Sequence, residues 1–181
     1  MNHLPIWFIG NIPSDLCDRA TDEFSRFPLH EATMGIQGND LNHIHRNTSV
    51  RFIDRGHWFE DKLKSVAYIG NKLCDWQYEI TGNENIQFAE YGIDQHYQWH
   101  TDTFALSGQP LDRKLTAVCL LNDPSEFTGG DFQVRLYTEY NAPLTKGSVI
   151  AFPSILEHRV TKVLSGIRKT ATMWLNGPRF K

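Results

Sequence analysis

The C-terminal part of the chain constrains the fold most strongly. From Gly82 onward, short runs of β-branched and aromatic residues alternate with turn residues, including Gly129-Gly130 and Lys146-Gly147. These runs predict seven strands: Ile86–Tyr91, Tyr97–Thr101, Leu115–Leu121, Phe132–Tyr137, Ser148–Phe152, His158–Val163 and Arg168–Leu175. Many closely spaced strands favour an antiparallel sandwich or barrel.

The N-terminal part predicts two helices that support this β structure. The first begins with Ser14 as N-cap and reaches Phe27, because Pro28 cannot continue it. The second spans about Trp58 to Tyr78, with an apolar stripe that faces the sheet. Glu60 lies outside that stripe. The fold class expected is therefore α+β.

Short strands are expected around the first helix and before the second. They are Pro5–Gly10, His30–Met34 and Val50–Ile53, and the polar segment Gly35–Asn47 between the last two is expected to be a mobile loop. No repeat, linker or low-complexity segment divides the chain. We therefore expect one domain over residues 1–181, with helical support at about 14–78 and a β core at about 86–176.

Charge and composition exclude several classes of protein. The formal net charge is −3, from 18 basic and 21 acidic residues, which argues against binding nucleic acid through its phosphates. No apolar run approaches the roughly 20 residues that span a bilayer, so no membrane partner is expected. Three widely separated cysteines indicate reduced thiols, and the N-terminal apolar stretch is too short for a signal peptide. These features predict a cytoplasmic protein.

The segment QWHTD holds the first part of a candidate metal site. His100 and Asp102 are two residues apart, so on a strand they would share one face. His158, which opens a later predicted strand at a sheet edge, is the best candidate for a third ligand. Two histidines and one carboxylate on one face suit non-haem Fe(II) in oxygenases. Taken alone, the two-residue spacing is also common among ordinary polar strand residues.

The last predicted strand carries a cation on the same face as three other candidate residues. Arg168, Thr170, Thr172 and Trp174 alternate along it. A buried arginine is costly unless it is paired, and a carboxylate matches its two parallel N–H groups. No carboxylate of the chain is an obvious partner, so a bound dicarboxylic acid is attractive. Thr116 on a facing strand and Tyr91 are expected to donate hydroxyl hydrogen bonds to the same carboxylate.

Four motifs in order resemble one known family. They are YGIDQHYQWHTD (91–102), LTAVCLLND (115–123), TGGDF (128–132) and HRVTKVLSGIRKTATMW (158–174). Together they resemble the prolyl-4-hydroxylase-like branch of the Fe(II)- and 2-oxoglutarate-dependent dioxygenases, over about half of the chain. Two departures from that pattern are Arg168, where collagen-type enzymes usually have lysine, and Leu120, where some oxygen-sensing members have tyrosine.

The resemblance implies both a fold and a reaction. The fold is a double-stranded β-helix (jelly roll) with Fe(II) held by His100, Asp102 and His158. Arg168 binds the C5-carboxylate of 2-oxoglutarate, with Tyr91 and Thr116 as partners, and Trp174 lies near the cosubstrate. O₂ is consumed, succinate and CO₂ are released, and ascorbate is a candidate further cofactor. The intact Asp102 favours hydroxylation over halogenation.

The substrate and two other kinds of protein stay open at this stage. A prolyl or other residue of a protein or peptide is the first choice, and a free amino acid or other small metabolite is the alternative. His96 and His100 have the spacing of a helical zinc-hydrolase pair, but Tyr97 stands where that motif needs glutamate. A metal-binding jelly roll without turnover is the remaining alternative. The sequence does not indicate an oligomeric state.

Overall fold

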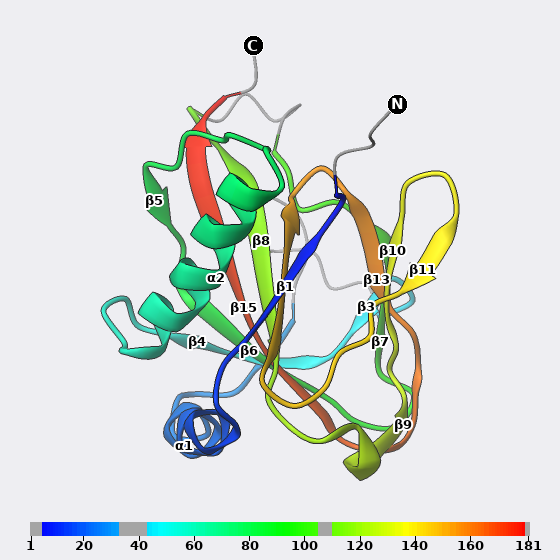
Figure 1. Ribbon diagram of the computed structural model, residues 1–181. Helices are drawn as coiled ribbons and strands as arrows, with labels where there is room; N and C mark the ends of the chain where they lie inside the picture. Colours follow the sequence, from blue (N-terminus) through cyan, green and yellow to red (C-terminus); the bar gives the residue numbers. More distant parts are fainter. Residues whose placement is uncertain (1–4, 33–42, 105–109, 180–181) are drawn as a thin grey trace.

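Two helices and two antiparallel sheets lie in layers (Figure 1). The computed structural model describes residues 5–32, 43–104 and 110–179. The helices are α1 (Ser14–Phe24) and α2 (Phe59–Leu73). In Figure 1, α2 lies in front of the larger sheet and α1 lies below it. This is the jelly-roll arrangement with two supporting helices that the sequence predicts.

Each sheet has its own strand order. The larger sheet runs β1 (Phe8–Asn11), β12 (Ser148–Pro153), β8 (Leu111–Leu120), β15 (Arg168–Pro178), β6 (Ile86–Tyr91), β4 (Ser49–Ile53) and β2 (His30–Glu31), with β5 (Gly82–Asn83) also paired to β15. The smaller sheet runs β11 (Glu139–Asn141), β10 (Phe132–Arg135), β13 (Glu157–Val160), β7 (His96–His100) and β3 (Arg46–Asn47). A further pair joins β9 (Phe127–Gly129), which follows the short 3-10 helix Pro124–Glu126, to β14 (Val163–Gly166).

Alternation along the central strands gives the larger sheet two different faces. On β15, Ala171 and Met173 are fully buried and pack in one core cluster with residues of α1 and α2. Thr170 and Thr172 point the other way and line a pocket between the sheets. Successive residues of a strand point to opposite faces, so one strand fills the core and also lines the pocket.

Helix α1 begins and ends differently from the prediction. Pro13, not Ser14, is the N-cap residue, because its carbonyl accepts from the Cys17 amide at 3.3 Å. The helix ends at Phe24, and Phe27 closes a final turn by donating its amide to Phe24 at 3.1 Å. Proline has φ fixed near its helical value but lacks an N–H, so it suits the first positions of a helix.

Helix α2 is shorter than predicted. It ends at Leu73, and the positive φ values of Asp75 and Gln77 (both 55°) then turn the chain away from helical geometry. Glu60, although outside the predicted apolar stripe, is buried. It is only 4% exposed and accepts hydrogen bonds from the Gly56 amide and from Lys64, so its carboxylate is compensated inside the fold.

Most predicted strands are present, although several begin or end at other residues than predicted. The predicted strand His158–Val163 is divided into β13 and β14, since Thr161 bonds to Asp131 between them. His158 does not lie at a sheet edge, because β13 is flanked by β10 and β7. Residues 35–42 of the predicted loop Gly35–Asn47 lie outside the described residues, but Arg46–Asn47 at its end form β3 and pair with β7.

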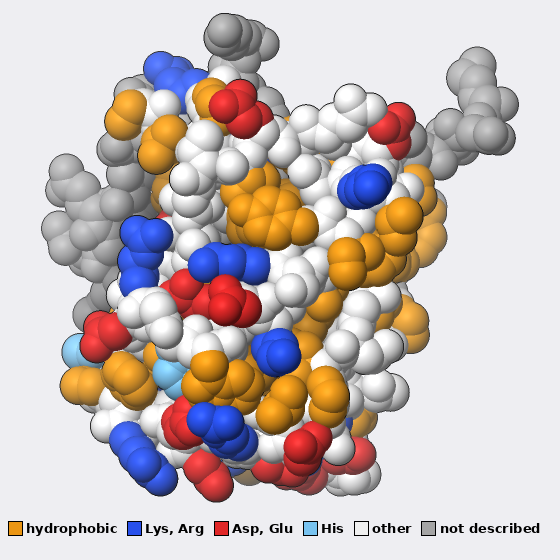
Figure 2. Space-filling model, turned by 60° about the vertical axis from the view of Figure 1, so that its left-hand side comes forward, with side chains coloured by type: hydrophobic (Ala, Val, Ile, Leu, Met, Phe, Trp, Pro, Cys, Tyr) orange, Lys and Arg blue, Asp and Glu red, His pale blue; other side chains and the backbone are white. Residues whose placement is uncertain are grey.

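The outer surface is mixed in character. Figure 2 shows hydrophobic side chains separated by Lys, Arg, Asp and Glu side chains across one face. Within the described part of the chain, neither helix combines the length and apolarity needed to cross a membrane.

Candidate metal centre

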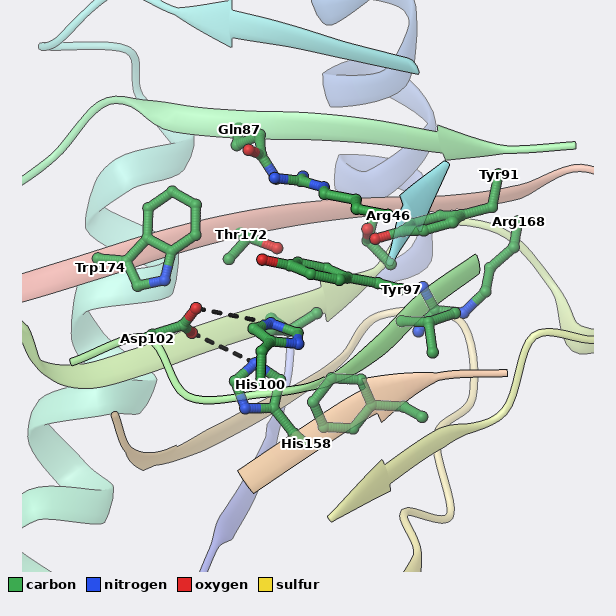
Figure 3. Close-up of a pocket in the computed structure, with 14 residues that line it drawn as sticks. Arg46, Gln87, Tyr91, Tyr97, His100, Asp102, His158, Arg168, Thr172 and Trp174 are labelled. Carbon is green, nitrogen blue, oxygen red and sulfur yellow. Dashed lines mark ion pairs between the residues drawn. The ribbon is translucent and has the colours of Figure 1, made fainter. Parts of the chain in front are cut away.

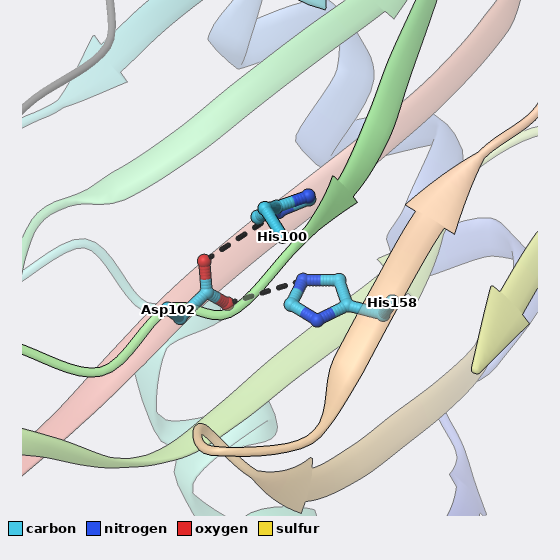
Figure 4. A group of neighbouring side chains, drawn as sticks. All are labelled: His100, Asp102 and His158. Atoms are coloured by element: carbon cyan, nitrogen blue, oxygen red, sulfur yellow. Dashed lines mark ion pairs between the residues drawn. The ribbon is translucent and has the colours of Figure 1, made fainter. Parts of the chain in front are cut away.

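Three of the predicted site residues converge between the two sheets (Figure 4). His100 ends β7 and His158 lies on the adjacent strand β13, where the two are direct register partners. Asp102 lies two residues beyond the end of β7. The ligating atoms of the three side chains all lie within 4.8 Å of one another. Asp102 faces both rings, with Oδ2 3.3 Å from His158 Nε2 and Oδ1 3.7 Å from His100 Nε2.

Backbone carbonyls fix the orientation of both imidazoles. His100 Nδ1 is 2.7 Å from the Gln98 carbonyl, and His158 Nδ1 is 2.9 Å from the Leu156 carbonyl. A carbonyl oxygen only accepts, so each Nδ1 carries the hydrogen. Each Nε2 is therefore the nitrogen left to bind a metal, and both Nε2 atoms face Asp102.

The charge state of the cluster also suits a cation. Burial, together with the nearby His158, lowers the pKa of His100 to about 3, so this imidazole is neutral at neutral pH. Burial alone would raise the pKa of Asp102, but the facing His158 and His100 more than offset it and hold that pKa below its usual range. Two imidazole nitrogens and one carboxylate on one side leave the opposite side open, which fits non-haem Fe(II).

The cluster opens into a pocket between the sheets (Figure 3). Its lining residues are Arg46, Gln87, Tyr91, Tyr97, His100, Asp102, Val118, Phe132, His158, Val160, Arg168, Thr170, Thr172 and Trp174. In Figure 3, Arg168 and Trp174 occupy opposite ends of the group. Both project from β15, so this one strand places a cation and an indole on either side of the metal ligands.

Arg168 is a buried cation at one end of the pocket. It is 2% exposed, and its Cζ lies 5.6 Å from the centre of the Tyr91 ring on the neighbouring strand. Burial lowers the pKa of Arg168 to about 10, so it stays protonated at neutral pH. Among the described residues, its guanidinium belongs to none of the ion pairs. A buried cation of this kind favours an anionic ligand.

Gly130 makes room for this arginine. Its φ is +66°, and a Cβ atom there would lie 3.0 Å from Arg168 Cδ and 3.0 Å from Val163 Cγ2. A glycine is thus required at position 130, both because of the backbone conformation there and because Arg168 approaches closely.

Thr116 lies elsewhere than expected. It is paired in register with Trp174, six residues along β15 from Arg168. Six residues of a strand span about 20 Å. Thr116 and Arg168 are therefore too far apart to bind the same carboxylate group, contrary to the expectation. Its hydroxyl instead donates to Asp102 Oδ2 at 2.8 Å.

Trp174 has a polar atom that the described residues leave unsatisfied. The residue is 8% exposed, and its Nε1 has no hydrogen-bond partner there. Its ring is held by the Arg113 guanidinium, 3.9 Å from the ring centre, and Arg113 is held by two hydrogen bonds of 2.7 and 2.6 Å to Glu84. The Arg113 guanidinium therefore fixes the position of the indole ring, and the Nε1–H can donate a hydrogen bond to a bound ligand.

Tyr97 and Arg46 are among the pocket residues that were not identified from the sequence. Tyr97 stacks on His100 with ring centres 3.5 Å apart, and burial raises the pKa of its phenol to about 12. Arg46 lies over the Tyr97 ring, with its Cζ 4.6 Å from the ring centre. Tyr97 is three residues from His100, a spacing that puts two residues of a regular strand on opposite faces. The register shift between β7 and β13 brings both to the same side.

The helical zinc pair is excluded by the same geometry. His96 and His100 lie on a strand, and both ring nitrogens of His96 are occupied, 3.1 Å from the Asp94 carbonyl and 3.0 Å from the Ile44 carbonyl. His96 is 8% exposed, so it is a buried structural residue.

A jelly roll with two histidines and one carboxylate at an open site defines a mononuclear non-haem iron oxygenase. The sequence model of the 2OG-Fe(II) oxygenase superfamily matches residues 86–176, half of the chain. The chain belongs to this superfamily, whose cofactors are Fe(II), 2-oxoglutarate and O₂.

Similar proteins agree with this assignment. A PKHD-type hydroxylase from Picosynechococcus is 35% identical over 89 residues, covering 49% of this chain and 40% of the relative. The chain thus spans less than half the length of that relative. A viral collagen prolyl hydroxylase from Paramecium bursaria Chlorella virus-1 superposes with a TM-score of 0.70 at 19% identity, covering 96% of this chain and 97% of the other. A Trichoplax adhaerens prolyl hydroxylase, solved with a peptide fragment of hypoxia inducible factor, gives 0.71 at 17% identity, covering 94% and 83%.

Proposed function

We propose that this protein is a 2-oxoglutarate-dependent dioxygenase that hydroxylates a C–H bond of a protein or peptide, with a prolyl residue as the first-choice target. The observation that carries the reaction class is the position of Arg168. This buried cation lines the same pocket as His100, Asp102 and His158 and is in no ion pair among the described residues. Residues 1–181 are proposed to act as one domain, because both helices share a core with the larger sheet.

Each residue of the pocket has a proposed role. His100, Asp102 and His158 hold Fe(II), and Arg168 binds the distal carboxylate of 2-oxoglutarate with Tyr91 beside it. Trp174 offers its indole N–H at the other end of the pocket. When bound, the iron and its cosubstrate supply the oxidising chemistry, and succinate and CO₂ are the products. The residues of the chain orient the iron and the cosubstrate and hold the C–H bond of the substrate close to the iron.

The choice of a peptide substrate rests on the neighbours in fold. One is named as a collagen prolyl hydroxylase, and another was solved with a peptide. Both are under 25% identical to this chain, so they support the fold and make the peptide a hypothesis to test. Arg168, in place of the lysine usual in collagen-type enzymes, loosens the inference to collagen-like peptides in particular.

Mass spectrometry of reaction mixtures tests the substrate. Purified protein is incubated with Fe(II), 2-oxoglutarate, O₂ and ascorbate, once with a proline-containing peptide library and once with free amino acids and metabolites. We expect peptides that gain one oxygen only when 2-oxoglutarate is present, and none with Asp102→Ala. Oxygen found only on free amino acids or metabolites would replace the peptide by the small-molecule alternative. Absence of succinate in every mixture would contradict the reaction class.

A further inference from the structure

A chain of three buried hydrogen-bonding groups ends at the Asp102 carboxylate. Thr116 Oγ1 lies 2.8 Å from Asp102 Oδ2 and 3.0 Å from Ser154 Oγ. Thr116 and Ser154 are fully buried, and Asp102 is 7% exposed. An ionised carboxylate only accepts, so Thr116 uses its single hydroxyl hydrogen on Asp102. Ser154 must then donate to Thr116, and the direction of both hydrogen bonds is fixed.

Ser154 also holds the backbone of the same segment. Its carbonyl accepts from the amides of Asp102 and Thr103 at 2.9 and 3.2 Å, and its own amide donates to the Lys114 carbonyl at 3.0 Å. It follows β12 directly and precedes His158 by four residues. One residue therefore ties the segment that carries Asp102 to β8 and to the turn that leads into His158.

Asp102 needs such support because it stands outside regular structure. No strand pairing of its own fixes its backbone beyond the end of β7. A free carboxylate can rotate, or can bind a cation through both oxygens and fill a position that an external ligand needs. A hydrogen bond to one oxygen restricts both motions, and partners of this kind set ligand orientation at metal sites.

We propose that Thr116 and Ser154 are positioning residues that fix the Asp102 carboxylate for metal binding. Thr116 acts directly on the carboxylate oxygen, and Ser154 acts through Thr116 and through the Asp102 backbone. This role concerns the metal ligand alone, so it holds whichever substrate the protein acts on.

Substitutions that remove or retain the hydroxyl test the proposal. Thr116→Val removes it at nearly constant volume, Thr116→Ser keeps it, and Ser154→Ala removes only the second hydroxyl. Thr48→Val is the matched control, because Thr48 is 4% exposed and donates at 2.8 Å to the Glu90 carbonyl, not to a ligand of the site. Mn(II) affinity is measured by electron paramagnetic resonance titration, which needs no turnover, and thermal unfolding is recorded on the metal-free proteins.

Metal affinity and stability should respond differently. We expect Thr116→Val to weaken Mn(II) binding about 10- to 100-fold and Ser154→Ala by a smaller factor of at least about threefold. Thr116→Ser should remain within about threefold of the unmodified protein. Thr48→Val should lower the unfolding temperature without changing Mn(II) affinity.

Two results would overturn the proposal. One is a folded Thr116→Val protein that binds Mn(II) as tightly as the unmodified protein; the other is Thr116→Ser binding as weakly as Thr116→Val. If Thr116→Val does not fold, the Mn(II) affinity of Ser154→Ala is the test. An unchanged Mn(II) affinity in Ser154→Ala would then contradict the proposal.

Discussion

Replacing Arg168 with alanine should weaken 2-oxoglutarate binding far more than metal binding. Arg168 is 2% exposed, so the distal carboxylate would lose its cation in a site where water cannot easily replace it. Losing one partner of a buried, hydrogen-bonded charge pair costs about 2–5 kcal/mol. That range corresponds to about 30-fold to several thousand-fold in affinity. Arg168→Lys should fall between, because the charge remains but the two parallel N–H groups do not.

The assay is calorimetric titration of 2-oxoglutarate into Mn(II)-loaded protein without oxygen. Arg135→Ala is the control, since Arg135 is a cation on β10 that pairs with Glu157 at 2.9 Å and does not line the pocket. It should bind 2-oxoglutarate as the unmodified protein does. If Arg168→Ala binds 2-oxoglutarate with unchanged affinity while retaining Mn(II), the cosubstrate does not bind at this arginine.

Three further predictions follow from individual contacts. Trp174→Phe, which removes the unsatisfied Nε1–H, should weaken 2-oxoglutarate affinity about threefold to tenfold in the same titration; unchanged affinity would contradict a role in binding the cosubstrate. Gly130→Ala should weaken 2-oxoglutarate binding, whereas Gly56→Ala, also at positive φ (+88°) but with nothing within 4 Å, should only lower the unfolding temperature; equal effects on binding would refute the clearance argument. Hydrogen bonds from Arg19 and Trp58 lower the pKa of Glu23 from 4.5 to about 2, so its contribution to stability is complete above pH 4.5 and is lost as the pH falls toward 2. Thermal unfolding of Glu23→Gln should therefore depend less on pH in that window, and an identical dependence would contradict it.

The strands of the larger sheet could be predicted well from the sequence. The strand Ile86–Tyr91 has the predicted bounds, and the alternation of Arg168, Thr170, Thr172 and Trp174 correctly places all four on the pocket side. Period-2 alternation is a local property, so it is visible in the sequence. The start of α1 and the end of α2 were less predictable. The first depends on the Pro13 carbonyl, and the second depends on the positive φ values after Leu73.

Contacts between strands were harder to predict than the strands themselves. That Thr116 pairs with Trp174, and so lies far from Arg168, depends on a register that no local pattern shows. Tyr97 enters the pocket only through an irregularity between β7 and β13. Arg46 follows a polar segment without periodicity, so nothing in its neighbourhood indicated a buried position.

The iron stoichiometry of ligand variants tests the central claim most directly. Fe(II) is added without oxygen to the unmodified protein, to Asp102→Ala and to His158→Ala, and bound iron per chain is measured after removal of the excess, with circular dichroism to verify the fold. We predict one Fe(II) per chain for the unmodified protein and none for either folded variant. A folded Asp102→Ala or His158→Ala protein that retains one Fe(II) per chain would show that the iron is not held by these residues.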